Sequence, residues 1–117
     1  MLRRKWLLLL AVGAVELLGA DLNGQWNFIW QTPGGERRTT LRLEQKAGHV
    51  EAFFPEAKEP ITGTFKDGKL SLAGRVYSSE AGEAADFHLE GTLSNGELKG
   101  TGGWGEHPLS FTARKAE

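Results

Sequence analysis

The chain has 117 residues, and its 14 basic and 15 acidic residues give it a net charge of −1. It contains no cysteine, so we expect neither a disulfide framework nor the lipid-bearing cysteine of a lipoprotein. Residues 1–20 hold three of the basic residues and one of the acidic ones, which leaves 11 against 14 and a net charge of −3 in the remainder. Because no basic stripe remains to attract phosphates, the composition argues against a nucleic-acid partner.

Residues 1–20 have the layout of a secretory signal peptide. A basic head at residues 3–5 precedes an apolar run at residues 6–15, and Leu18-Gly19-Ala20 offers a small residue for cleavage. The alternative is a transmembrane anchor, but ten apolar residues fall short of the roughly 20 that span a bilayer. We therefore predict no stable membrane anchor, and a single mature domain of residues 21–117 that a bacterium delivers to its periplasm or secretes.

The mature chain begins with an alternating pattern that is typical of a half-buried strand. Trp26, Phe28 and Trp30 share one face, and polar residues occupy most of the other. Proline and glycine at residues 32–35 and glycine at residue 48 are turn signals. The first three strands are expected at residues 25–31, 37–45 and 49–54.

Two glycine dipeptides predict two further hairpins. Asp67-Gly68 and Asn95-Gly96 suit the two central positions of a type I′ turn, where both residues need a positive φ. A two-residue turn at each place brings like faces together. The expected pairs are Phe65 with Leu70, Gly63 with Leu72, Ile61 with Gly74, Leu93 with Leu98, Gly91 with Gly100, Leu89 with Gly102, and Phe87 with Trp104.

A small-residue loop at residues 78–84 and a turn at residues 105–108 complete the pattern, with Leu109, Phe111 and Ala113 facing inward in a last strand. Eight short strands joined by hairpins predict an all-β fold, an eight-stranded antiparallel up-and-down barrel that closes on itself and so removes its edges. Several glycines would face inward. They allow strands to coil sharply, or they leave room for a ligand.

Polar clusters offer little chemistry. His49, His88 and His107 do not have the spacing of metal ligands, so we expect surface histidines and no metal or cofactor. Asp86, His88 and Glu90 share one face of a strand, but alternation places that face outside the barrel. A charge ladder with neighbouring strands therefore explains them better than catalysis, which would require the opposite parity.

Aromatic residues dominate the predicted interior. Each buries roughly 150–250 Å², so together they could fill a small barrel or line an apolar cavity for a hydrophobic guest. The candidate ligand-binding residues of such an interior are Phe28, Trp30, Leu43, Phe65, Leu72, Phe87, Leu89, Trp104 and Phe111.

Gly24-Gln25-Trp26 on the first strand and Arg114 after the last resemble the calycin superfamily of lipocalins and fatty-acid-binding proteins. The resemblance implies a lipocalin-like barrel in which Trp26 plugs one end and Arg114 packs over the indole, a cation–π contact. The chain is much shorter than a true lipocalin and lacks the usual helix and disulfide after the last strand. Gly24–Trp26, Thr32–Gly35 and Ile61–Thr64 also resemble a group of small exported bacterial domains without a settled activity.

These observations favour an exported, non-enzymatic and monomeric barrel that binds a small apolar molecule or lipid. The guest would enter at the end away from Trp26, past residues 55–60 or 78–84. The alternative is a solid-cored module that docks on a cell-envelope protein or enzyme, an inhibitor being one form of it. Such a module requires a contiguous exposed apolar patch, with Ile29, Phe53 or Phe54, and Tyr77 as its candidates.

Overall fold

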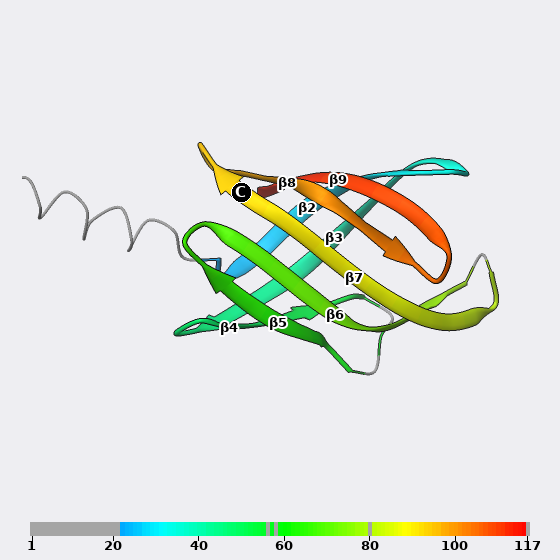
Figure 1. The fold of residues 1–117 in the computed structure, drawn as a ribbon, viewed down its shortest axis with the longest axis horizontal. Coiled ribbons are helices and arrows are strands. Elements are labelled where there is room, and N and C mark those ends of the chain that lie inside the picture. The colour runs from blue at the N-terminus through cyan, green and yellow to red at the C-terminus, as the bar shows by residue number, and fades with distance from the viewer. Residues whose placement is uncertain (1–21, 56, 58, 80, 117) are drawn as a thin grey trace, which may run out of the picture.

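The protein is a closed barrel of eight antiparallel strands in which each strand pairs with its neighbours in the chain and the last pairs with the first (Figure 1). The structure is a computed structural model that describes residues 22–55, 57, 59–79 and 81–116. The predicted signal peptide lies outside these residues. The strands are β2 (Gly24–Thr32), β3 (Gly35–Lys46), β4 (His49–Phe53), β5 (Ile61–Lys66), β6 (Lys69–Ser78), β7 (Glu83–Ser94), β8 (Glu97–Trp104) and β9 (His107–Lys115). The all-β, up-and-down barrel fold that the sequence predicts is therefore confirmed, and in the described part of the chain there is no helix of the length and apolar character needed to cross a membrane.

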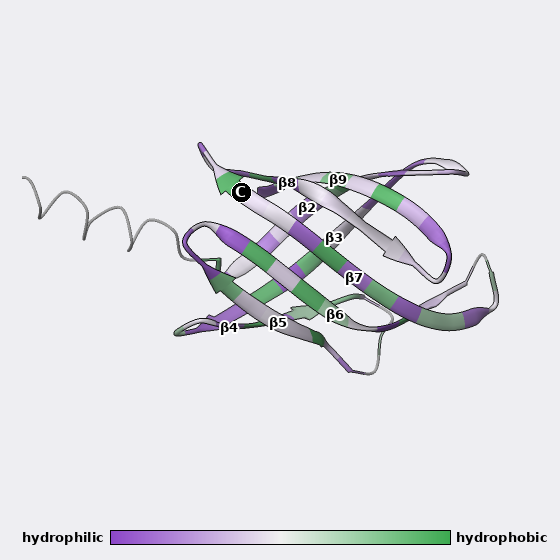
Figure 2. Ribbon diagram, in the orientation of Figure 1, coloured by the Kyte–Doolittle hydropathy of each residue, from purple (hydrophilic) through white to green (hydrophobic). Residues whose placement is uncertain are grey.

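Side-chain alternation explains which face of each strand turns inward. In β2, Trp26, Phe28 and Trp30 are buried, whereas Gln25 and Asn27 are exposed. The same period of two appears as alternating hydrophobic and hydrophilic bands along β6, β7 and β9 (Figure 2). Because the inward face of every strand is mostly apolar and the sheet closes on itself, the strands bury a core without help from a helix.

The two glycine dipeptides form the predicted turns. Asp67 and Asn95 both have φ of 54°, and Gly68 and Gly96 both have φ of 78°, as a type I′ turn requires. The register follows from these turns: Phe65 lies opposite Leu70 in the first hairpin, and all four predicted pairs of the second hairpin are present. The pairing of β5 with β6 ends at Thr62 and Ala73.

Several boundaries differ from the predictions. The first two strands are longer than expected, at Gly24–Thr32 and Gly35–Lys46, and the last strand begins at His107, inside the predicted turn at residues 105–108. The third strand ends at Phe53, one residue early, and is followed by the connection to β5. Residues 78–84 are not one loop, since β6 and β7 continue until Ser78 faces Glu83. The backbone N–H of Gly82 donates to the Ser78 carbonyl (2.8 Å), which closes a shorter turn.

Apolar side chains fill the interior, and the inward glycines serve close packing. A Cβ atom added at Gly63 would lie 1.7 Å from the Ser71 carbonyl oxygen, and one at Gly100 would lie 1.9 Å from that of Glu90. The space beside Gly91 is taken by the Phe111 ring, 2.8 Å from the corresponding Cβ position. Of the two uses that the sequence left open, sharp coiling of the strands accounts for these glycines, and they do not leave a cavity. The buried core consists of Leu22, Trp26, Phe28, Trp30, Leu41, Leu43, Val50, Ala52, Ile61, Phe65, Leu70, Leu72, Val76, Phe87, Leu89, Leu98, Phe111 and Ala113.

Candidate ligand site at the open end of the barrel

One end of the barrel is closed by the residues that precede β2. Leu22 is fully buried, and its carbonyl accepts a hydrogen bond from the Trp26 indole Nε1–H (2.9 Å). The Leu22 backbone N–H donates to Gln45 Oε1 (3.0 Å), and the Gln45 backbone N–H donates to Asn23 Oδ1 (2.8 Å). Chain and indole therefore hold one another across this end, which we call the closed end.

Gly24 permits the chain to enter β2 from this crossing. Its φ is +128°, a conformation that residues with a Cβ rarely adopt. A positive φ explains the glycine at this position, and Trp26 is 2% exposed at the closed end.

Arg114 is not placed over the indole. In the ladder it faces Asn27 on β2 and Glu97 on β8, and its guanidinium lies 3.7 Å from the Glu97 carboxylate. Lys115 is the residue of β9 opposite Trp26. Because neighbouring residues of a strand point to opposite faces, Arg114 belongs to the outer surface. The described partner of the indole N–H is the Leu22 carbonyl (2.9 Å), and the Gly-x-Trp motif does not point to Leu22.

The other end of the barrel carries a pocket with a volume of about 570 Å³, which we call the mouth pocket. Three hairpin ends surround it, those of β2–β3, β6–β7 and β8–β9, and they stand at the end of the barrel opposite the start of β2 (Figure 1). Its described lining residues are Trp30, Thr32, Pro33, Gly34, Arg37, Val76, Ser78, Ala81, Phe87, Trp104, His107, Pro108 and Leu109.

Aromatic rings form the floor of the mouth pocket. Trp30 and Phe87 are each 5% exposed and meet edge to face, with ring centroids 5.9 Å apart. Phe54, which directly follows β4, packs on both of them, with ring centroids 6.4 Å from Trp30 and 5.4 Å from Phe87. Trp104 is half-buried and stacks with His107 at 6.0 Å.

Both indoles of the pocket already donate their hydrogen bonds to the protein. Trp30 Nε1–H donates to Thr39 Oγ1 (2.7 Å), and Trp104 Nε1–H donates to the Val76 carbonyl (2.7 Å). These bonds fix the ring orientations, and they leave ring carbon atoms as the contact surface that the two indoles offer to a guest.

The structure gathers three of the nine predicted ligand-binding residues around the mouth pocket: Trp30, Phe87 and Trp104. Val76, Leu109 and the two prolines were not among the candidates, although their positions near the turns of one barrel end could have suggested them. The remaining candidates are not at this pocket. Phe28, Phe65, Leu72, Leu89 and Phe111 are buried in the core, and Leu43 is buried toward the closed end.

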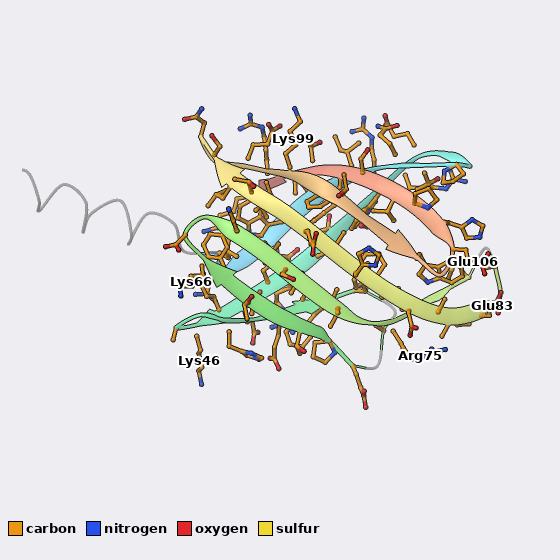
Figure 3. The ribbon with its side chains drawn as sticks, viewed as in Figure 1. Lys46, Lys66, Arg75, Glu83, Lys99 and Glu106 are labelled. Carbon is orange, nitrogen blue, oxygen red and sulfur yellow. The ribbon has the colours of Figure 1, made fainter. Side chains whose placement is uncertain are left out.

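The acidic and histidine residues of β7 lie on the outer surface. Asp86, His88 and Glu90 are exposed, and Arg75 Nη1 lies 3.1 Å from Asp86 Oδ1. Figure 3 shows the Arg75 side chain projecting away from the barrel. The predicted parity of this strand is confirmed. Within the part of the chain that the structure describes, no three histidine or acidic residues are grouped so that they could hold a metal ion.

One pKa is shifted at the open end, in the β2–β3 hairpin. Hydrogen bonds from the side chains of Arg38 and Gln31, together with the charge of Arg38, lower the pKa of the Glu36 carboxyl below its usual value. The Arg38 Nε–Glu36 Oε2 distance is 2.9 Å. Since both side chains of the pair are exposed to solvent, it orders the hairpin surface with little effect on stability.

The apolar residues proposed for a docking patch do not form one. Ile29 lies on β2 and Tyr77 on β6, and three strands separate β2 from β6 in either direction around the barrel. The Arg42 guanidinium lies over the Phe53 ring, 4.0 Å from its centroid, and Phe54 packs against the core. Among the described residues, Tyr77 is the large apolar side chain that stands exposed, at 52%.

Comparison with known proteins assigns no relative. No protein-family model matches the chain, and neither a curated protein nor a solved structure matches it significantly.

Proposed function

We propose that this protein is an exported, non-enzymatic, lipocalin-like barrel that binds a small apolar molecule in the mouth pocket. The observation that carries the proposal is the aromatic and aliphatic lining of that pocket, floored by Trp30 and Phe87 and walled by Trp104 and Leu109. Its volume of about 570 Å³ falls within the range of small-molecule sites, roughly 300–1,000 Å³.

The packing of the barrel supports a guest at the mouth in preference to one deep inside. Directly beneath Trp30 lie Phe28 and Phe111, with ring centroids 5.0 and 5.7 Å from the indole. Both rings are almost fully buried. Because close-packed aromatic rings leave no channel below Trp30, a long acyl chain has no path toward the closed end.

The outward orientation of Asp86, His88 and Glu90 supports the non-enzymatic part of the proposal. A general acid or base needs a desolvated position beside its substrate. These three side chains are exposed on β7, on the opposite face of the sheet from the mouth pocket.

Native mass spectrometry of the protein recovered from its own export compartment tests the proposal. We expect an apolar adduct that is lost on denaturation. Leu109→Trp should abolish the adduct by filling the pocket. Ile29→Trp is the matched control, because Ile29 is also half-buried but lies on the outer face of β2, and this variant should keep the adduct. An adduct that both variants retain would contradict binding in the mouth pocket.

A solid-cored module that docks on a cell-envelope protein is the second candidate. The filled interior favours it, and Tyr77 is the exposed large apolar side chain, among the described residues, that a partner could contact. This candidate predicts that the native protein carries no adduct, and that Tyr77→Ser weakens association with the partner while Leu109→Trp does not. The opposite response of these two variants separates docking from ligand binding.

A further inference from the structure

We propose that the guest of the mouth pocket is a compact, planar aromatic molecule held by ring stacking, and not an acyl chain or a saturated ring system. This inference rests on the proposed function and names its ligand class. It follows from three features of the described residues: the arrangement of the rings, the hydrogen bonds that the indoles already make, and the depth of the pocket.

Aromatic rings occur both on the floor of the pocket and at its rim. Trp30 and Phe87 meet edge to face on the floor, and the Trp104 and His107 rings are nearly parallel, 14° apart, on the wall formed by β8 and β9. Aromatic pairs prefer offset stacked or edge-to-face contacts, since ring faces are electron-rich and ring edges are electron-poor. A flat aromatic guest can use both kinds of contact here.

The indoles cannot act as hydrogen-bond donors to a guest, because each N–H is already used at 2.7 Å. Of the nearby hydroxyl groups, that of Thr32 is used as both donor and acceptor, and that of Ser78 is used as an acceptor. Thr32 Oγ1 donates to the Gly35 carbonyl (2.8 Å) and accepts from the Gly34 N–H (3.1 Å), and Ser78 Oγ accepts from the Ala81 N–H (3.2 Å). Ring faces therefore supply most of the attraction inside the pocket.

A polar substituent of the guest would meet the imidazole of His107 at the rim. This side chain is exposed, and its described interaction is the stack on Trp104. The open end carries charges of both signs, with Arg37 in the pocket lining and Glu83 and Glu106 at the same end of the barrel (Figure 3). Since these charges do not select one sign, a neutral aromatic with a hydroxyl group is the guest that fits.

Depth excludes an extended chain. Trp30 and Phe87 seal the floor at 5% exposure each, and the rings of Phe28 and Phe111 lie against Trp30 from below. A flat molecule can lie against this floor with its whole ring face, whereas an extended acyl chain finds no channel below it.

The ligand class can be tested with three probes on the protein as the cell exports it. 2-Naphthol and decahydro-2-naphthol share a carbon skeleton and a hydroxyl group but differ in aromaticity, and octanoate represents an acyl chain. We would follow the indole N–H signals of Trp26, Trp30 and Trp104 by two-dimensional NMR during each titration. Trp26 is the internal control, because it lies at the closed end.

We expect 2-naphthol to shift the Trp30 and Trp104 signals without moving Trp26, and to bind more tightly than its saturated analogue. The ratio of the two dissociation constants should be roughly 2- to 13-fold, the factor that one aromatic pair contributes beyond its buried area. Trp104→Leu should remove this preference. If that variant fails to fold, His107→Leu at the exposed rim should reduce the preference, and Tyr77→Leu on the outer face should leave it unchanged.

Equal affinity for the two ring systems, or a preference for octanoate, would overturn the aromatic ligand class while leaving the proposed function intact. If none of the three probes shifted Trp30 or Trp104, both the ligand class and binding in the mouth pocket would be wrong.

Discussion

Replacing Leu22 by alanine should destabilise the barrel by about 3–5 kcal/mol. Leu22 is 0% exposed, and a buried Leu→Ala change costs roughly 2–5 kcal/mol depending on how far the surroundings collapse into the void. Here the backbone is held on both sides of the side chain, by Gln45 at the N–H and by the Trp26 indole at the carbonyl. Collapse is therefore restricted, and the upper part of the range applies.

Equilibrium unfolding in urea measures this loss. We expect a lower midpoint at an unchanged slope, since the variant exposes almost the same surface on unfolding. The melting temperature should fall by more than about 12 °C, because each kcal/mol corresponds to roughly 4–8 °C in a domain of this size. Tyr77→Ala, at an exposed position on β6, is the control and should stay within about 0.5 kcal/mol of the native protein. A loss below about 0.5 kcal/mol for Leu22→Ala would refute its place in the core and the closed end built on it.

Substitutions at three further positions test separate parts of the structure. Trp26→Phe should lower the free energy of unfolding by about 1–3 kcal/mol, because it leaves the buried Leu22 carbonyl without its hydrogen-bond donor. Trp26→Ala should lower it by about 3–5 kcal/mol, because it also creates a cavity. Both are measured by urea unfolding, and a change below 1 kcal/mol in the alanine variant would contradict the plug. Gly96→Val should destabilise the protein by about 1–3 kcal/mol, because φ is 78° at this position. Gly96→Asn should be nearly neutral, because asparagine tolerates that conformation. Equal melting temperatures for the valine and asparagine variants would show that the turn is misplaced. Arg38→Gln should raise the pKa of Glu36 toward its ordinary value in a side-chain NMR titration. Since the folded pKa is lowered, the pair contributes its small stability above the unfolded pKa and loses it as the pH falls through the folded pKa; an unmoved Glu36 titration would exclude Arg38 as the cause.

Local rules determined the strands, their inward faces and the register of two hairpins. Alternation in β2 and the φ values of Asp67-Gly68 and Asn95-Gly96 depend on a residue and its near neighbours. The alternation of side chains and the two-residue turns can therefore be predicted from the sequence. Eight such strands close into a barrel because an open sheet would leave two unpaired edges.

The tertiary structure alone decided what lies at the two ends. The burial of Leu22 and the filling of the space beside Gly91 by Phe111 depend on which strands meet across the closed barrel. So does the choice of Trp30, Phe87 and Trp104, out of all the inward aromatic residues, to line the mouth pocket. A strand's own pattern specifies the face on which a side chain lies, but its neighbours across the barrel are set by stagger and coiling of the whole sheet. For this reason the sequence by itself determined the strands of the barrel and their inward faces, whereas packing between strands across the barrel determined the closed end and the mouth pocket.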